Sequence, residues 1–392
     1  MRIRRCAIVY LEPREDAAFD LDSLLNGGAG IRRRLRWLAL APHLAAEIEV
    51  DPAQRELLGR IGPGAWTDAA PWLAEQADTL AGLLDCGLLL SEDDSDEVRA
   101  AHRVGDEALR SGHWWPPAAL AHRLGRWQGL DSAAAMDAAE MSTAADLRRQ
   151  LGAPPPHAIE RAPADARLPL PRLDDGEFER LLARRATCRN FDAARALPYE
   201  LFARMLQRVF AAQAQVRISD DTVFLKKHTP SGGGLHATEA YLIVQNVEGV
   251  APGLYHYHPV EHALEPLPAP AAPLAEFAAQ AVAGQHWFAD AHALVVLAPR
   301  YARSFWKYRQ HAKAYRALVL DVGHLSQTAY LSATELGLGA FVTSAINEVD
   351  IERAFGLDPL ADGPLAVCGF GWRGERMRTS EFDPAGGVWP RD

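Results

Sequence analysis

The sequence predicts an α+β protein with a small N-terminal domain and a larger C-terminal domain, and three observations support this prediction. The chain has 392 residues, which exceeds the length of one typical domain. Prolines crowd residues 154–171, where they prevent regular structure and favour an extended linker. Long helical patterns and continuous apolar runs of strand length begin only after that linker. We therefore expect domains at residues 1–97 and 174–392, with a helical and proline-rich linker region at 98–173.

The N-terminal domain is expected to mix short strands with two helices. Leu35–Leu40 and Glu47–Val50 have the composition of strands. Asp51, followed by a proline, predicts the start of a helix, because aspartate caps free amide groups and proline fits the first turn. A second helix is predicted by apolar residues at helical spacing, namely Leu73, Ala77, Leu80 and Leu84. An apolar run at Leu88–Leu90 and an acidic run at 91–97 then close the domain.

The C-terminal domain is expected to contain buried strands and one long helix. Tyr241–Val244 and Ala293–Ala298 are continuous apolar runs, which is typical of strands covered on both faces. Between Phe305 and Gly337 the pattern predicts a long helical stretch with an apolar stripe. A helix that is apolar over so many turns is expected in a core or in a subunit interface.

Composition and charge exclude several classes of function. The formal net charge of -10 argues against a nucleic-acid partner, because phosphate backbones demand a basic surface. The four cysteines form no C-x-x-C pair, which favours a reducing, cytoplasmic location. No stretch approaches the ~20 apolar residues of a membrane span, and the N-terminus lacks the apolar run of a signal peptide. The fourteen histidines show no zinc-site spacing, so no metal is expected.

An arginine motif opens the C-terminal domain, with the pattern R-x-T-x-R at Arg185, Thr187 and Arg189. Two guanidinium groups with a hydroxyl between them can hold a phosphate dianion, because their paired donors match its oxygens. Taken alone, the motif more often marks a solvated charge cluster at a helix end.

A glycine-rich loop follows between Thr229 and Tyr241. Glycines let the backbone approach a flat ring or a phosphate closely, and their N–H groups become available donors. An ordinary flexible turn is the alternative, and neither the Walker motif nor the dinucleotide fingerprint fits. The preceding Lys226, Lys227 and His228 are expected to form a solvated loop, with a basic rim for an acidic peptide as the alternative.

A third motif combines Lys307 and Tyr308, a candidate base and a candidate acid. This role requires that burial or nearby charge moves the lysine pKa toward working pH, and a plain helix face is the alternative. Two further glycine-rich segments follow, at 337–339 and at 369–374, and the second contains Arg373.

Taken in order over residues 180–375, these stretches resemble the SagB-type dehydrogenases, the azoline-oxidase or peptide maturation dehydrogenase branch of the FMN-dependent nitroreductase superfamily. The resemblance implies a nitroreductase-like C-terminal domain. It implies that the FMN phosphate is held by Arg185, Thr187, Arg189 and Arg373. It also implies that the flavin is lined by the P-S-x-G-x-L-H segment, which is Pro230, Ser231, Gly232, Gly234, Leu235 and His236, followed by Glu239 and Tyr241.

The same resemblance implies that Lys307 and Tyr308 are the catalytic pair. It places the backbone of Gly337, Leu338 and Gly339 beside the isoalloxazine ring, where an N–H group would orient and tune the flavin. Two positions depart from the family pattern: Ala237 replaces the usual proline, and Thr328 stands where an asparagine normally lies.

The resemblance further implies a homodimer that shares its FMN sites, and a precursor peptide as substrate. Thiazoline or oxazoline rings of that peptide would lose two electrons and two protons to become azoles. The N-terminal pattern resembles the PqqD-like, winged-helix modules, which bind a leader peptide as an added strand. A structural cap or a dimer arm is the equal alternative for this domain, and a cyclodehydratase-type modifying enzyme is a candidate partner.

Two other functions stay open at this point. The first is an NAD(P)H-fed flavin reductase that acts on dehydroamino acids, nitroaromatics or quinones. The second is a non-catalytic peptide-binding scaffold in a modifying complex. Bleaching of the flavin by peptide without nicotinamide would favour the oxidase, and a protein that stays colourless with FMN would favour the scaffold.

Overall fold

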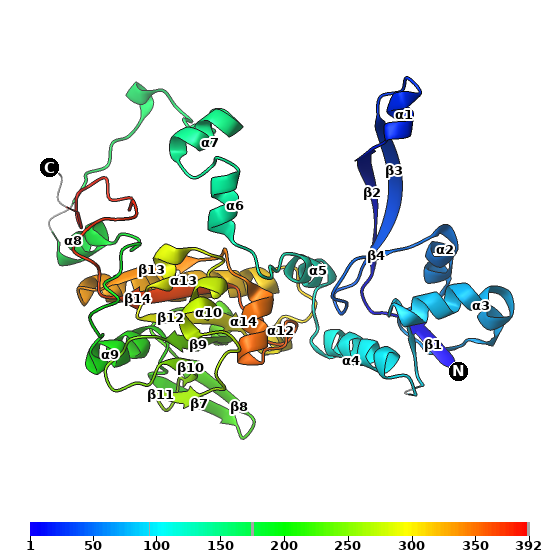
Figure 1. The fold of residues 1–392 in the computed structure, drawn as a ribbon. Helices are drawn as coiled ribbons and strands as arrows, with labels where there is room; N and C mark the ends of the chain where they lie inside the picture. Colours follow the sequence, from blue (N-terminus) through cyan, green and yellow to red (C-terminus); the bar gives the residue numbers. More distant parts are fainter. Residues whose placement is uncertain (94, 174–175, 390–392) are drawn as a thin grey trace. The chain divides into compact units, whose positions relative to one another are not determined.

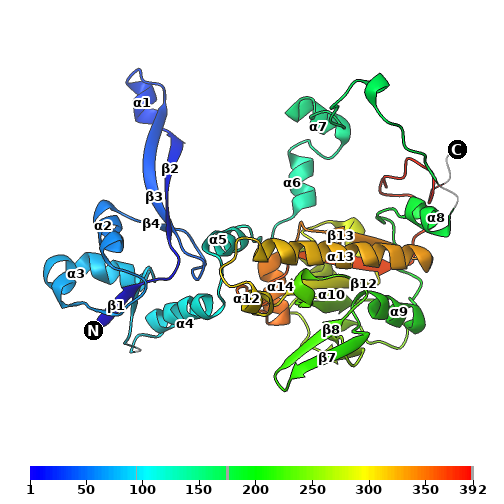
Figure 2. The ribbon, with the colours of Figure 1, turned by 180° about the vertical axis from the view of Figure 1, so that it is seen from behind.

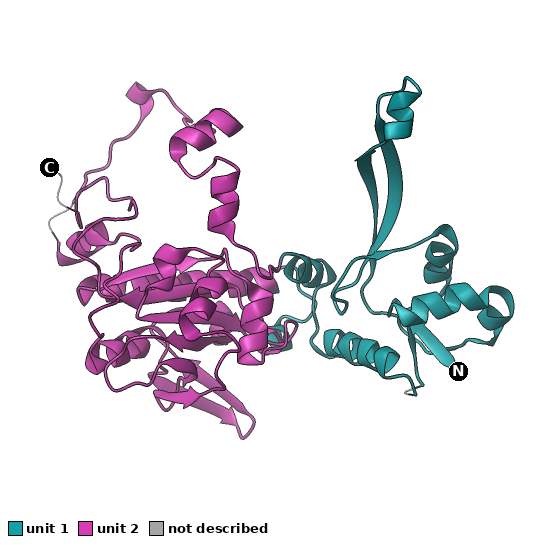
Figure 3. Cartoon of the chain, viewed as in Figure 1, with its two compact units in different colours: residues 1–125, 305–314 teal, residues 126–304, 315–392 magenta. Residues whose placement is uncertain are grey.

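The computed structural model describes residues 1–93, 95–173 and 176–389. The chain divides into two compact units, shown in different colours in Figure 3. The first unit comprises residues 1–125 and 305–314, and the second comprises residues 126–304 and 315–392. The first unit therefore extends past the expected boundary at residue 97. It does so because the helix at Glu97–Ser111 belongs to its core, where the buried carboxylate of Asp106 accepts hydrogen bonds from Ala7 N (2.5 Å) and Arg110 Nε (2.6 Å).

The first unit contains two small antiparallel sheets and several helices. Its elements are β1 (Arg2–Arg5), β2 (Tyr10–Phe19), α1 (Leu21–Leu25), β3 (Ile31–Leu40), β4 (Ile48–Glu49), α2 (Pro52–Arg60), β5 (Thr67–Asp68), α3 (Ala70–Asp85), β6 (Leu89–Ser91), α4 (Glu97–Ser111) and α5 (Pro116–Leu124). The strand orders are β5-β1-β6 and β2-β3-β4. The expected strands and helices of this unit are present, whereas β1 and β2 were not predicted.

Local sequence signals explain the helices of this unit. Asp51 caps α2, since its side chain accepts a hydrogen bond from Gln54 N while the Gln54 side chain accepts one from Asp51 N. Helix α3 buries Leu80, Leu83 and Leu84, and the chain then turns through residue 87, a glycine with φ of 78°. Strand β2 escaped prediction because its partly buried positions are charged, namely Glu12, Arg14 and Asp16, so the sequence shows no apolar alternation there.

The second unit contains the remaining elements. They are α6 (Ser132–Ala138), α7 (Ala144–Leu151), the 3-10 helix η1 (Ala164–Ala166), α8 (Glu177–Arg184), α9 (Tyr199–Val209), β7 (Ala214–Ser219), β8 (Thr222–Lys226), the 3-10 helix η2 (Gly232–Gly234), β9 (Thr238–Val244), β10 (Gly253–His258), β11 (Ala263–Pro266), α10 (Leu274–Ala281), α11 (His286–Ala289), β12 (Ala293–Pro299), α12 (Tyr301–Lys307), α13 (Ala314–Glu335), β13 (Gly339–Thr343), α14 (Glu348–Phe355) and β14 (Ala366–Gly371). Only the first part of α12 belongs to this unit, because residues 305–314 belong to the other one. The proline-rich residues 154–171 form no regular element except η1.

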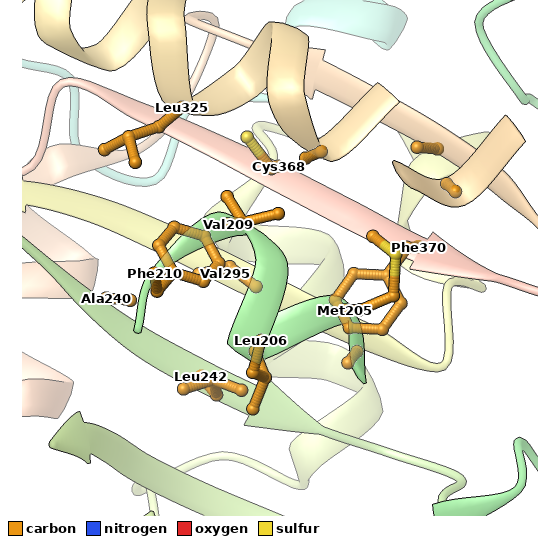
Figure 4. Close-up of a cluster of buried hydrophobic side chains, with 14 of the residues drawn as sticks. Met205, Leu206, Val209, Phe210, Ala240, Leu242, Val295, Leu325, Cys368 and Phe370 are labelled. Atoms are coloured by element: carbon orange, nitrogen blue, oxygen red, sulfur yellow. The ribbon is translucent and has the colours of Figure 1, made fainter. Parts of the chain in front are cut away.

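A six-stranded sheet with the order β11-β10-β9-β12-β14-β13 forms the centre of the second unit (Figure 1). Each pairing in this sheet is antiparallel. One face packs on α9 and α13, and Figure 2 shows α13 running along the sheet. Residues Leu242 and Val295 point to that face, as the close-up in Figure 4 shows. Their neighbours Ile243 and Val296 point to the other face, which α10, α11 and α14 cover. The prediction that β9 and β12 are covered on both faces is confirmed.

The predicted single helix from Phe305 to Gly337 is wrong. The structure contains two helices, α12 and α13, and residues 308–313 between them form turns. The backbone of Gln310 has a φ of 52°, which is incompatible with a right-handed helix, and its N–H donates to the carbonyl of His113. The apolar stripe is real within α13, where Leu318, Leu325 and Ala333 are buried. Among the described residues, each helix is too short or too polar to cross a membrane.

Candidate functional site

The arginine motif lies beside the edge strand β13. Thr187 forms an isolated parallel bridge with Ala340, and Cys188 N donates to Ala340 O at 2.8 Å. The first residue of the motif, Arg185, caps the C-terminus of α8. Its guanidinium makes no hydrogen bond or ion pair with the residues that the structure describes, and it lies 5.3 Å from the centre of the Tyr330 ring. Its donors are therefore available to a ligand.

Tyr330 of α13 fixes the middle of the motif. Its hydroxyl lies 3.0 Å from Thr187 Oγ1 and accepts a hydrogen bond from Val342 N at 3.1 Å. Burial raises the pKa of Tyr330, so the phenol keeps its proton and can donate to Thr187. Tyr330 was not predicted as a site residue, because a tyrosine on an apolar helix stripe is indistinguishable in sequence from an ordinary core residue.

Arg373 returns to the same motif from the end of the chain. Its Nη2 donates to Ala186 O at 3.2 Å, and residue 373 forms an antiparallel bridge with Phe191. The structure thus brings Arg373 to the arginine motif, as the sequence analysis expected. Its other nitrogen, Nη1, forms an ion pair with Glu381, which the sequence analysis did not foresee.

Glu381 is a buried hub for this region. Its side chain has no exposed surface, and besides Arg373 it accepts hydrogen bonds from Arg189 N (2.6 Å), Asn190 Nδ2 (2.8 Å) and Trp389 Nε1 (2.8 Å). These bonds satisfy both carboxylate oxygens. The guanidinium of Arg189 is exposed and donates to the carbonyl of Ser380 at 3.1 Å. Residues 372–389 are therefore held against the arginine motif by hydrogen bonds.

Each residue of the Gly-Leu-Gly segment has a different structural role in the described fold. Gly337 has a φ of 74° and ends α13, while Leu338 is buried in the core. A Cβ atom on Gly339 would lie 2.6 Å from Cys188 Sγ, so only glycine permits this approach of the arginine motif to β13.

The glycine-rich loop is anchored on α13 by a residue that the sequence analysis also missed. Asp321, which is 5% exposed, accepts hydrogen bonds from Ser231 Oγ at 2.6 Å and from Gly232 N at 3.0 Å. The Ser231 hydroxyl in turn accepts from His236 N at 2.9 Å. A lone carboxylate among the apolar residues of α13 was the signal that could have identified Asp321.

The remaining loop residues differ in exposure. Pro230 is exposed, and Leu235 is buried. The backbone at Gly234 and at His236 has positive φ, 69° and 44°, which makes the turn tight. A Cβ atom on Gly232 would lie 3.1 Å from Ala317 Cβ, so the loop packs closely on α13 at this glycine.

The prediction of a solvated loop is wrong for Lys227, whose residue surface is only 4% exposed. The side chain is buried because the loop folds back over it, and burial lowers its pKa. Lys226 and His228 on either side are exposed, as expected.

A charged network continues from Lys227 along β9. Glu239 forms an ion pair with Arg300, with 2.7 Å between Oε1 and Nε, and lies 3.4 Å from His256 Nε2. Burial would raise the pKa of Glu239, but the His256 hydrogen bond and the charges of Arg300 and Lys227 outweigh burial and lower it. The carboxylate therefore stays ionised.

Lys307 and Tyr308 belong to the first compact unit. Lys307 is exposed at the end of α12, and Tyr308 begins the turn that follows. The Lys307 ammonium lies 5.4 Å from the centre of the Tyr308 ring. Both residues belong to the first unit, whereas the arginine motif and the glycine-rich loop belong to the second.

The residues of the second unit fit a flavin mononucleotide chemically. Arg185, Thr187 and Arg189 lie on one segment, which Arg373 contacts at Ala186 O, and these residue types are a donor set suited to a phosphate. Arg373 would have to share its guanidinium between Glu381 and that phosphate. The loop at 231–236 presents side-chain-free backbone, which suits a flat ring.

Comparison with known proteins supports this interpretation. Residues 182–372 match the Nitroreductase family. The expected nitroreductase-like C-terminal domain and the α+β fold are thereby confirmed.

Two relatives are processing proteins by name. The trifolitoxin-processing protein TfxB of Rhizobium leguminosarum bv. trifolii is 28% identical over 150 residues, 36% of this chain and 39% of TfxB. The microcin B17-processing protein McbC of Escherichia coli is 27% identical over 157 residues, 39% of this chain and 57% of McbC. The chain therefore spans less than two thirds of either relative. These matches confirm the expected resemblance to peptide-maturation dehydrogenases.

A solved structure is also among the matches. The E. coli microcin synthetase McbBCD complex with truncated pro-MccB17 bound contains a chain that is 21% identical, with a TM-score of 0.48. The match covers 73% of this chain and 100% of that chain.

Proposed function

We propose that the chain is an FMN-dependent oxidoreductase that dehydrogenates azoline rings in a ribosomally made peptide. One observation carries the proposal: Arg373, far from the arginine motif in sequence, donates to the carbonyl of Ala186 within that motif. Scattered arginines that converge on one segment are what a phosphate-bearing cofactor requires. The processing proteins TfxB and McbC among the relatives favour a peptide as the substrate.

Each group of residues has a proposed role. Arg185, Thr187, Arg189 and Arg373 bind the phosphate of FMN. The loop from Pro230 to His236 and the segment Gly337–Gly339 position the ring, and FMN supplies the two-electron acceptor. Lys307 or Tyr308 removes a proton from the azoline ring as a hydride leaves it, so that the ring loses two protons and two electrons.

The first unit is proposed to recognise the precursor peptide. Its sheet β5-β1-β6 has two outer strands, and an extended peptide can add to such an edge. A photo-crosslinker placed in the leader of the precursor should attach to residues 1–125. Attachment only within residues 126–304 would show that the first unit does not recognise the peptide.

We further propose a homodimer that works in the cytoplasm beside a cyclodehydratase-type enzyme.

The test of the reaction is the absorbance spectrum of the purified chain with FMN in the absence of oxygen. Adding precursor peptide that already carries azoline rings should bleach the flavin without nicotinamide, and readmitting air should restore the yellow colour. Bleaching by NAD(P)H alone would instead support a flavin reductase. A chain that stays colourless with added FMN would exclude a flavoenzyme and would support a non-catalytic peptide-binding scaffold.

Matched arginine variants test the cofactor site directly. Arg185→Ala should weaken FMN binding about tenfold or more, because a charge-assisted hydrogen bond contributes about 1.5–3 kcal/mol. Its neighbour Arg184 is exposed at the end of the same helix, so Arg184→Ala should leave affinity unchanged. Equal affinities for both variants would show that Arg185 does not touch the phosphate.

A further inference from the structure

A hairpin arm of the first unit carries an apolar face that is open to solvent. The arm comprises residues 10–40, in which β2 and β3 pair along their whole length and α1 lies in the connection between them. Figures 1 and 2 show the arm extending from the rest of the first unit, with α1 at its far end. Successive residues of a strand point to opposite sides, so the arm has two faces of different composition.

One face of the arm carries charges that are already paired. It contains Glu12, Arg14 and Asp16 of β2 together with Arg32, Arg34 and Arg36 of β3. Arg14 pairs with Glu12 and Arg36 pairs with Asp16, while Arg34 and Arg32 pair with Glu49 and Asp20. This charged face therefore needs no further partner.

The opposite face, which we call the apolar face, has the composition of a core. It contains Leu11, Pro13, Glu15, Ala17 and Phe19 of β2 together with Ile31, Arg33, Leu35, Trp37 and Ala39 of β3. Its two charged residues, Glu15 and Arg33, form an ion pair at 2.6 Å. At the base of the arm this face is covered, because Ala39 is buried and Trp37 packs against the core of the first unit.

Farther along the arm the apolar face has lost that cover. Phe19 is 73% exposed, Leu35 is 63% exposed and Ile31 is 54% exposed. Helix α1 adds three exposed leucines at the tip and buries none of its residues. Antiparallel sheets normally turn their apolar face to a core, and contiguous apolar surface left in water marks an interaction site.

The charges of the arm favour a second copy of this chain as the partner. Residues 10–40 contain five acidic residues and five arginines, so the net charge of -10 lies outside the arm. Two copies can therefore meet at their arms without the repulsion that the rest of their surfaces would cause. The apolar face is also self-complementary, because its acidic residue lies on β2 and its basic residue on β3.

We propose that the apolar face of the arm packs against the same face of a second copy, as two sheets stacked face to face. A two-fold axis parallel to the strands places β2 of each copy over β3 of the other, so each Glu15 meets an Arg33 across the interface. This contact between arms is separate from any association of the second units, and it does not depend on the proposed flavin chemistry.

A cysteine crosslink tests the contact in the full chain. Ala17 and Ala18 are exposed neighbours that point to opposite faces, so Ala17→Cys places a thiol in the interface and Ala18→Cys places one outside it. At equal concentration, a short bismaleimide should join two Ala17→Cys chains with several times the yield of Ala18→Cys, and the unaltered chain gives the background. Equal yields at the two positions would overturn the proposal. So would no crosslink at Ala17→Cys, which is expected if the face binds a different protein.

Reversing one charge tests whether the copies meet in the proposed way. In the Ala17→Cys chain, Glu15→Arg makes both charged residues of the face basic and Arg33→Glu makes both acidic, so each variant alone should crosslink severalfold less. Mixing the two variants should restore the yield, because each arginine then faces a glutamate of the other copy. Both side chains are more than half exposed, and far-ultraviolet circular dichroism checks that the variants stay folded. No recovery on mixing would overturn the proposed contact. FMN binding is read separately from visible absorbance, so the two proposals can fail independently.

Discussion

Arg373 is tied to Glu381, a carboxylate whose side chain has no exposed surface. This pair joins two parts of the chain, because Arg373 also donates to Ala186 O and Glu381 also accepts from Arg189 N. The ion pair therefore organises the arginine motif before any ligand binds. A phosphate at this motif would meet an arginine that already has its orientation.

Replacing Glu381 with glutamine should destabilise the fold. The change removes the charge that balances Arg373, and removing one partner of a buried pair costs about 3 kcal/mol. The free energy of unfolding, measured by urea denaturation, should fall by about this amount. Glu375 is exposed in the same segment, and Glu375→Gln should change stability little. Similar stabilities for the two variants would show that the ion pair and hydrogen bonds of Glu381 do not stabilise the fold.

Alanine at Gly339 should also destabilise the chain. Its Cβ would lie 2.6 Å from Cys188 Sγ, and such overpacking costs about 1–3 kcal/mol. Gly323 is a control at which alanine should raise stability, because it lies in α13 with nothing within 4 Å of its Cβ position. Gly323→Ala should stabilise by about 0.5–1 kcal/mol, since alanine favours the helix. Thermal unfolding of both variants measures the difference.

Asp321→Asn should loosen the glycine-rich loop. The amide keeps one acceptor oxygen, so one of the two loop donors loses its bond, at a cost of about 1–2 kcal/mol. We expect faster hydrogen exchange at the Gly232 amide and weaker FMN binding. Asp220 is exposed between β7 and β8, and Asp220→Asn should leave both measurements unchanged. Unaltered exchange at Gly232 in Asp321→Asn would show that another group holds the loop.

The His256–Glu239 pair should make stability depend on pH. The hydrogen bond to Glu239 raises the pKa of His256, with Glu265 adding to it and burial opposing it. A raised folded-state pKa stabilises the protein below the unfolded-state pKa of about 6.5, and this contribution disappears as pH rises through the folded-state value. Wild type should therefore exceed His256→Gln in stability by up to about 1 kcal/mol near pH 6 and by much less near pH 8. His157 is exposed, and His157→Gln should show no such trend. If wild type and His256→Gln differed in stability by the same amount near pH 6 and near pH 8, the titration of His256 would not contribute to stability.

Lys307→Ala should separate chemistry from cofactor binding. If Lys307 acts as the base, the variant should keep its yellow colour but turn over at least about a hundredfold more slowly. Lys313 is an exposed lysine of the same segment, and Lys313→Ala should retain full turnover. Undiminished turnover in Lys307→Ala would remove this lysine from the reaction and leave Tyr308 as the base.

Sequence patterns predicted the features that depend on residues close together in the sequence. The cap at Asp51 and the two-sided burial of β9 and β12 follow from residue type and spacing, and the structure confirms them. The break between α12 and α13 was missed, because Gln310 carries no turn signal of its own and its amide bonds to the distant His113. Helical periodicity simply continues across the break.

The sequence predicted only the residues that we propose to bind the ligand. Arg373 was assigned to the arginine motif by family resemblance, and the structure brings the two together. Asp321, Tyr330 and Glu381 were missed, because each acts through a partner that is remote in sequence. Lys227 was misjudged because its burial depends on how the loop folds over it. Such supporting contacts cannot be read from spacing.

The buried thiols make the chain convenient for fluorophore attachment. Burial raises the pKa of Cys6, Cys188 and Cys368 to about 12, and it raises the pKa of Cys86 as well. Thiolates are therefore scarce at neutral pH, and maleimide dyes react with thiolates. A single cysteine engineered at an exposed position would take up the dye over a low background, so the two units could be labelled and watched without first removing the native cysteines.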